Sequence, residues 1–210
     1  MMGRIPTLEG VRAAVIASGG VWFWTPSKPW NANLLALRTP SREANRFDDA
    51  ICWACHDDDG RALWRVWKAT TDPGTFQLSR GTTSKGGAAV LAPGQYRSTH
   101  TIRDHGSSNP YPAICHRYDV PDLPVYRDYN ADNRIDLDGP IYRNGRGINV
   151  HRASAYREST QVDRWSAGCI VHAAPDTFDE MMVLARLSAA AWGNRFTLTL
   201  LHWPSMIWST

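Results

Sequence analysis

Two residue types that could act together in nucleophilic catalysis lie close to each other in the last third of the sequence. The stretch DRWSAGCIVH, residues 163–172, places Cys169 directly after Gly168, and the stretch GINVHRA places His151 18 residues before the cysteine. Cysteine attacks as a thiolate, and a neighbouring histidine can take its proton. Gly168 permits a tight turn, and the N–H groups of Gly168 and Cys169 could hold an oxyanion. The alternative is a buried cysteine that only packs, and the spacing alone leaves both open.

The two side chains can meet only if the segments that carry them become neighbours. GINVH and GCIV are short apolar runs typical of strands, and the polar loop RASAYRESTQVDRW joins them. The following segment, PDTFDEMMVLARLSAAAWGN, has apolar residues at helical spacing, acidic residues in its first turn and Gly193 at its end. We expect this helix to pack behind the Cys169 segment.

The rest of the chain is predicted to be mostly extended. TLEGVRAAVIASGG predicts a helix capped by Thr7. VWFW, ANLLALRT, AAVLAPGQYRSTHTI and RFTLTLLHW predict strands, and AICWACHDDDGRALWRVWKATT predicts a hairpin that turns at 57–60. The sequence therefore predicts a mainly β fold with a few helices (α+β), in a single domain over 1–210. Within it, 1–66 would supply a helix and strands, and 67–210 the catalytic core.

The residues around the cysteine resemble the signature of the L,D-transpeptidase catalytic domain family, the YkuD-like enzymes. In that family a histidine is followed, after a gap of this size, by Ser/Thr-His-Gly-Cys, and His151, Ser166, Gly168 and Cys169 match this pattern. The wider run 67–171 is similar to a divergent branch associated with phage and bacterial cell-wall proteins.

The resemblance implies an L,D-transpeptidase-like β-sandwich with a helix after the catalytic cysteine. It implies that Cys169 is the nucleophile, that His151 is its base, and that the backbone carbonyl of Arg152 orients the imidazole. The substrate would be a peptidoglycan stem peptide, with no cofactor required. Water as acceptor would make the enzyme an L,D-carboxy- or endopeptidase, and an amine would make it an L,D-transpeptidase.

Two departures from the family pattern concern the substrate. Ala167 stands where the family usually has a second histidine, and Val171 stands where it usually has Arg or Asn. We expect other residues to contact the substrate. The candidates are His105, in the predicted loop DHGSSNPYP, and Trp165, beside the motif.

An acidic stretch, DYNADNRIDLDG, has the spacing of a calcium loop. Its candidate ligands are Asp128, Asn130, Asp132 and Asp136. It departs from that pattern where Asn133 replaces Gly and where Gly139 replaces the last Glu. The sequence leaves two interpretations open, a structural Ca²⁺ site and a solvated acidic loop.

Two other metal-centre interpretations are weaker. CWACH matches the C-x-x-C-H pattern of haem attachment, but Cys52 and Cys55 would point to opposite faces of a regular strand. A zinc-dependent peptidoglycan peptidase would need several ligands in one place, and no H-E-x-x-H motif supports it.

Composition restricts the partners. The net charge is only +3, and the chain has no run of Lys or Arg and no nucleic-acid-binding motif, so we expect no nucleic-acid partner. The apolar patch near the start is interrupted by Glu9 and Arg12, so we expect neither a membrane span nor a signal peptide. We expect synthesis in the cytoplasm and action at the cell wall or periplasm, after non-classical export or lysis. A phage endolysin and an antibacterial effector both fit, and the rival class is a catalytically silent wall-binding or structural phage module.

Overall fold

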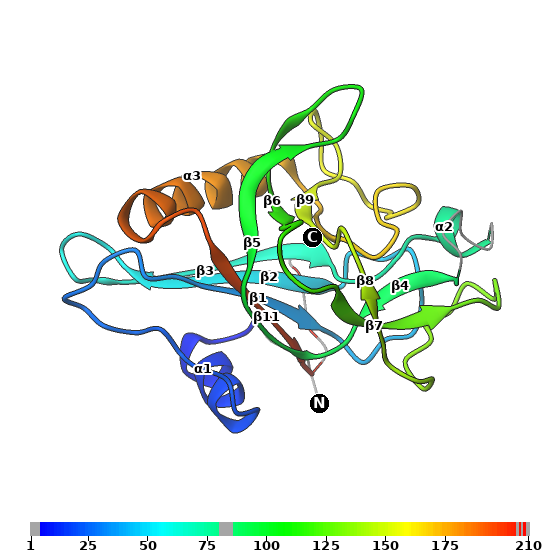
Figure 1. Ribbon diagram of the computed structural model, residues 1–210, viewed down its shortest axis with the longest axis horizontal. Coiled ribbons are helices and arrows are strands. Elements are labelled where there is room, and N and C mark those ends of the chain that lie inside the picture. The colour runs from blue at the N-terminus through cyan, green and yellow to red at the C-terminus, as the bar shows by residue number, and fades with distance from the viewer. Residues whose placement is uncertain (1–4, 80–85, 205, 207, 209–210) are drawn as a thin grey trace.

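The structure is a computed structural model that describes residues 5–79, 86–204, 206 and 208. The described residues form a mainly β fold with three helices, an α+β protein (Figure 1). The helices are α1 (Leu8–Ala17), α2 (Thr75–Ser79) and α3 (Pro175–Trp192). The strands are β1 (Asn33–Arg38), β2 (Asp49–His56), β3 (Ala62–Thr70), β4 (Ala88–Leu91), β5 (Gly94–His105), β6 (Tyr111–His116), β7 (Leu123–Asp128), β8 (Tyr142–Gly145), β9 (Val150–Arg152), β10 (Ile170–His172) and β11 (Phe196–His202).

Eight of these strands close into a barrel in the order β1-β11-β5-β6-β9-β10-β3-β2, and β4-β7-β8 form a small separate sheet. The pairs β1–β11 and β9–β10 are parallel, and the other neighbours are antiparallel. Strands from the start of the chain therefore share one barrel with β9 and β10. The boundary between the ranges 1–66 and 67–210 of the single predicted domain falls inside β3.

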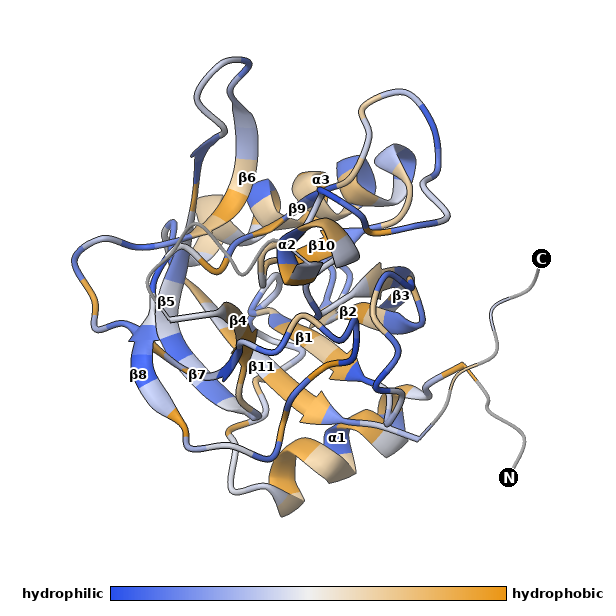
Figure 2. Ribbon diagram, turned by 90° about the vertical axis from the view of Figure 1, so that its right-hand side faces the viewer, coloured by the Kyte–Doolittle hydropathy of each residue, from blue (hydrophilic) through white to orange (hydrophobic). Residues whose placement is uncertain are grey.

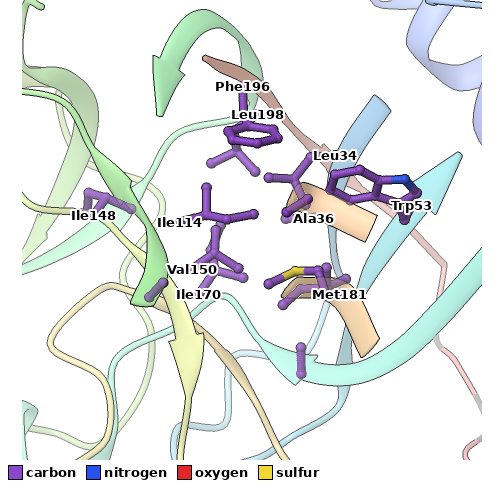
Figure 3. Close-up of a cluster of buried hydrophobic side chains, with 14 of the residues drawn as sticks. Leu34, Ala36, Trp53, Ile114, Ile148, Val150, Ile170, Met181, Phe196 and Leu198 are labelled. Carbon is purple, nitrogen blue, oxygen red and sulfur yellow. The ribbon is translucent and has the colours of Figure 1, made fainter. Parts of the chain in front are cut away.

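The barrel wall is apolar on both sides. Along β1, Leu34 and Ala36 face a large core cluster that includes α3, and Leu35 and Leu37 face a second cluster that includes α1. This alternation follows from the two-residue period of a strand. Figure 1 shows the two helices on opposite sides of β1 and β2. Figure 3 shows Met181 of α3 directed toward the side chains of β1 and its neighbours, and Figure 2 shows hydrophobic residues concentrated on β1.

Most of the predicted elements are confirmed. Thr7 caps α1 by accepting a hydrogen bond from the N–H of Gly10, β2 and β3 form the predicted hairpin, and α3 ends at Gly193. The predicted strands at ANLLALRT, GINVH, GCIV and RFTLTLLHW are β1, β9, β10 and β11. AAVLAPGQYRSTHTI breaks after β4, and the two parts enter different sheets.

The predicted strand VWFW is wrong, because residues 21–24 have no regular structure. The side chain of Asn33 replaces a strand partner there. Its Oδ1 accepts from the N–H of Phe23 at 3.0 Å, and its Nδ2 donates to the Phe23 carbonyl at 2.7 Å. Backbone groups satisfied by a side chain need no strand ladder.

The two cysteines of CWACH lie on opposite faces of β2, as predicted. Cys52 packs in the cluster with α1, and Cys55 packs in the cluster with α3. Both are fully buried. They are structural residues of the barrel wall, and the geometry gives no support to haem attachment.

Candidate active site

The parallel pair β9–β10 brings the predicted nucleophile and base to the same side of the sheet. Val171 pairs with His151. Cys169 lies two residues before Val171, and both pack on one cluster with Ala153, which lies two residues after His151. Because alternate residues of a strand share a face, Cys169 and His151 lie on one face. They are offset by two positions, about 6.6 Å along the strand.

The Cys169 thiol is held by the backbone of the segment that enters β9. Its Sγ donates to the Gly147 carbonyl at 3.4 Å and accepts from the Asn149 N–H at 3.4 Å. Neither hydrogen bond goes to His151. Burial raises the pKa of the Cys169 thiol to about 11. The resting form at neutral pH is therefore the neutral thiol, held by backbone groups on both sides.

A backbone carbonyl fixes the orientation and the tautomer of His151. Its Nδ1 lies 2.8 Å from the Arg152 carbonyl oxygen, the contact that the family resemblance implies. A carbonyl only accepts, so Nδ1 carries the proton and Nε2 keeps its lone pair. Burial, followed by the neighbouring His105 ring, lowers the pKa of His151 to about 3. The imidazole is neutral at physiological pH.

His105, expected in a loop that contacts substrate, instead ends β5 and lies against His151. Its ring stacks on that of His151, with centroids 4.3 Å apart and planes at 22°. Asn149 holds it there. The Asn149 Oδ1 accepts from the His116 N–H at 2.9 Å, so Nδ2 faces His105 Nδ1 at 3.2 Å. His105 therefore contacts His151 directly.

Asn149 was missed in the sequence. It contacts both halves of the candidate site, because its N–H donates to Cys169 Sγ and its side chain donates to His105. The signal was present in GINVHRA. Asn149 precedes His151 by two residues and so shares its strand face.

The turn before Cys169 is built on Ser166 and Gly168. The fully buried Ser166 hydroxyl donates to the Cys169 carbonyl at 2.8 Å and accepts from the Gly168 N–H at 3.1 Å. Gly168 has φ +123°, and a Cβ there would lie 2.2 Å from the Ala89 carbonyl oxygen. Only glycine fits.

This geometry corrects the expected oxyanion site. The Gly168 N–H already donates to Ser166, so it is not available to an oxyanion. The Cys169 N–H, in contrast, bonds to no residue that the structure describes, so it is the one of the two N–H groups that is free to donate.

Arg152 is fixed on the other side of β9. Its guanidinium lies over the Tyr111 ring at 4.0 Å and over the Phe178 ring at 5.5 Å, and its Nη1 is 3.8 Å from Asp179. The Tyr111 hydroxyl also donates to the Arg152 carbonyl, at 3.4 Å. These contacts hold in place the carbonyl that orients His151.

Trp165 does not join the Cys169 pocket. It is 43% exposed and lines a separate surface hollow in the loop between β9 and β10, with Arg157, Glu158 and Asp163 among its neighbours. A substrate role for Trp165 would require a ligand that extends across that loop.

The acidic loop folds on its own hydrogen bonds. Asp128 Oδ2 accepts from the Asp136 N–H at 3.1 Å, Asn130 Nδ2 donates to Asp136 Oδ2 at 3.0 Å, and Asp132 Oδ1 accepts from the Arg134 N–H at 2.8 Å. Asn133 takes the positive φ (61°) that a Gly would supply.

The carboxylates of this loop do not converge. Within the described ranges, no group of three or more His, Cys, Asp or Glu side chains is placed to hold a metal ion. Calcium binding stays a prediction, which calorimetric titration with Ca²⁺ would test.

The chain was compared with family models, with curated proteins and with solved structures. No family model, no curated protein and no solved structure matches the chain. In the part of the chain that the structure describes, none of the helices has the length and apolar character to cross a membrane. Any assignment of function must therefore come from the site itself.

Proposed function

We propose that this protein is a cysteine enzyme of L,D-transpeptidase or L,D-peptidase type, acting on amide bonds of peptidoglycan stem peptides at the cell wall or periplasm. We further propose that its barrel is a divergent form of the L,D-transpeptidase-like β-sandwich. One observation carries the proposal. The parallel pair β9–β10 puts Cys169 and His151 on one face, with the lone pair of His151 Nε2 fixed by the Arg152 carbonyl.

The proposed reaction begins when the Cys169 side chain rotates away from Gly147. His151 Nε2 takes the thiol proton as Sγ attacks the carbonyl carbon of the scissile amide. The oxyanion accepts a hydrogen bond from the Cys169 N–H. The C–N bond then breaks, the leaving amine takes the proton from His151, and an acyl-thioester remains on Cys169.

The second half restores the enzyme. Water or the amine of a second peptide attacks the thioester carbonyl and gives its proton to His151 Nε2. The C–S bond breaks, and the thiolate regains that proton. Water yields a shortened or cleaved stem peptide, and the amine yields a new cross-link.

The pKa values set the order of these events. The pKa of the Cys169 thiol, about 11, lies far above that of His151, about 3, so a resting thiolate–imidazolium pair is strongly disfavoured. Proton transfer must therefore accompany the attack. This distinguishes the proposed enzyme from a cysteine enzyme with a preformed ion pair.

The second candidate is a wall-binding or structural module without chemistry. It is favoured by the resting position of the thiol, whose two hydrogen bonds both go to backbone atoms. The zinc-peptidase alternative gains no support from any grouping of ligands among the described residues.

Mass spectrometry of muropeptides after incubation with isolated peptidoglycan tests the proposal. We expect the wild-type protein to produce new tri- or tetrapeptide ends or new cross-links. Cys169→Ala should produce neither, and Cys52→Ala, which alters a buried cysteine in another cluster, should remain active. Full activity of Cys169→Ala would reject the assignment of Cys169 as the nucleophile. A wild-type protein that leaves peptidoglycan unchanged would favour the wall-binding or structural module.

A further inference from the structure

A pocket of about 350 Å³ is lined in part by Cys169. Its walls come from the Cys169 turn, the segment that enters β9, and the small sheet β4-β7-β8. The lining residues are Ala89, Arg127, Asn144, Arg146, Gly147, Ile148, Ala167, Gly168 and Cys169. A group bound in this pocket would lie next to the reacting atom.

The small sheet fixes Arg127 relative to the cysteine turn. Arg127 of β7 pairs with Ala89 of β4, and Gly168 packs directly against the Ala89 carbonyl. One strand register therefore sets the position of the guanidinium with respect to Cys169. Arg127 is half-buried, so this position is also restrained by its surroundings.

The two arginines of the pocket differ in charge balance. Arg146 is neutralised by Asp122, with Nε and Nη2 at 2.7 and 2.6 Å from the same carboxylate oxygen. Arg127 instead donates to neutral oxygens. These are the Asn144 side chain at 2.7 and 3.1 Å, the Asn144 carbonyl at 2.9 Å and the Gly87 carbonyl at 3.1 Å.

The Arg127 guanidinium therefore keeps a net positive charge at the pocket wall, because it forms no ion pair with any residue that the structure describes. The hydrogen bonds to neutral oxygens orient the planar group without neutralising it. These four hydrogen bonds occupy Nε, both N–H groups of Nη2 and one N–H of Nη1. The second Nη1 N–H stays free, and a carboxylate oxygen can accept a charge-assisted hydrogen bond from it.

We propose that this pocket binds an anionic group, and that Arg127 selects acyl donors with a free carboxylate next to the scissile amide. The second part rests on the proposed function, because it assumes that Cys169 attacks a peptide. The first part, an anion pocket at the sulfur, does not depend on it. A free main-chain or side-chain carboxylate of a peptide has the required chemistry.

Alkylation of Cys169 with two small probes tests the anion pocket without any peptidoglycan. Iodoacetate and iodoacetamide both form an S–CH₂ bond and release iodide, but only iodoacetate carries a carboxylate. For each thiol, the rate with iodoacetate is divided by the rate with iodoacetamide, and the thiol of glutathione serves as the reference. We expect this rate ratio to be about three- to fivefold higher for Cys169 than for glutathione, because a surface ion pair contributes a factor of this size. Peptide mapping would assign the reaction to Cys169.

Substitutions of Arg127 test whether its guanidinium causes the preference for iodoacetate. Arg127→Gln should lose the preference for iodoacetate while the iodoacetamide rate changes less than about twofold. Arg143→Gln, which removes an exposed arginine of β8 outside the pocket lining, should keep it. Arg127→Lys, which retains the charge, should keep part of it. If Arg127→Gln does not fold, raising the NaCl concentration should reduce the preference of the wild-type protein.

A rate ratio equal to that of glutathione, or unchanged in folded Arg127→Gln, overturns the anion pocket. This outcome is separate from the muropeptide test. Peptidoglycan cleavage without an iodoacetate preference would reject the pocket alone. An iodoacetate preference in a protein that leaves peptidoglycan unchanged would keep the anion pocket and reject the enzymatic function.

Discussion

The imidazole rings of His105 and His151 stack with their centroids 4.3 Å apart, although 45 residues of chain separate their positions from one another. The Asn149 amide fixes one ring and the Arg152 carbonyl fixes the other. The stack limits the rotation of His151 and keeps its Nε2 atom aimed in one direction. We infer that His105 is a positioning residue for the base.

Replacement of His105 tests this role. We expect His105→Ala to lower kcat/KM by about ten- to a hundredfold, because the base loses its stacking partner and misorients. His105→Phe should restore most of the activity, since it keeps the stack. Steady-state kinetics on a defined muropeptide measures both. Equal losses in the two variants would show that stacking is not what positions His151.

The resting protonation of the site predicts an unusual pH profile for thiol labelling. Because the pKa of Cys169 is raised to about 11, the thiolate fraction should increase about tenfold for each pH unit between 7 and 9. Iodoacetamide labelling followed by peptide mapping measures this rise. A plateau below pH 8 would indicate a preformed thiolate–imidazolium pair instead. Cys169→Ala is the control that excludes the three other, buried cysteines.

The turn at Gly168 should tolerate no side chain. Gly168→Ala places a Cβ 2.2 Å from the Ala89 carbonyl oxygen at φ +123°, so we expect a loss of about 2–4 kcal/mol in the free energy of unfolding. Gly139→Ala is the matched control. No atom lies within 4 Å of its Cβ position, and the change should stay within about 0.5 kcal/mol. Urea unfolding compares the two, and similar stabilities would contradict the packing of Gly168 on β4.

Local patterns predicted many of the elements, but they gave a false strand at residues 21–24, missed α2, β6, β7 and β8, and did not predict the barrel. The helical spacing of residues 175–192 and the 57–60 turn depend on neighbours in the chain, and both are confirmed. Barrel closure depends on pairings such as β1 with β11, whose partners lie about 160 residues apart. No periodicity within one segment contains that information.

The residues of the candidate site also fall into those that the sequence predicts and those that only the long-range sheet pairing brings in. His151 lies in β9 and Cys169 directly precedes β10, two short strands that the sequence marks clearly, and their adjacency follows from a single crossover. His105 and Arg127 come from β5 and β7, and they reach the site only through long-range sheet pairing. The oxyanion expectation for Gly168 failed for a local reason, because the Ser166 hydroxyl captures its N–H.

His172 provides the last prediction, which concerns acid stability. Its ring is fully buried on the opposite face of β10 from Val171, 5.6 Å from the Trp67 ring and with Nε2 3.2 Å from Met181 Sδ. Burial lowers its pKa from the ordinary 6.5 to about 3. The His172 side chain of the folded state therefore becomes protonated at a lower pH than that of the unfolded state. The stability that neutral His172 contributes is complete above pH 6.5 and is lost between pH 6.5 and 3.

A variant without this titration should lose less stability in acid. We expect His172→Gln to be less stable than the wild-type protein at pH 7.5, because glutamine packs less well in that position. The difference in the free energy of unfolding between the wild-type protein and His172→Gln should shrink by about 2–3 kcal/mol as the pH falls from 6.5 to 4.5, since one pKa unit corresponds to about 1.4 kcal/mol. Urea unfolding at each pH measures the gap. A constant difference across this range would mean that His172 gains its proton at the same pH in the folded and unfolded states.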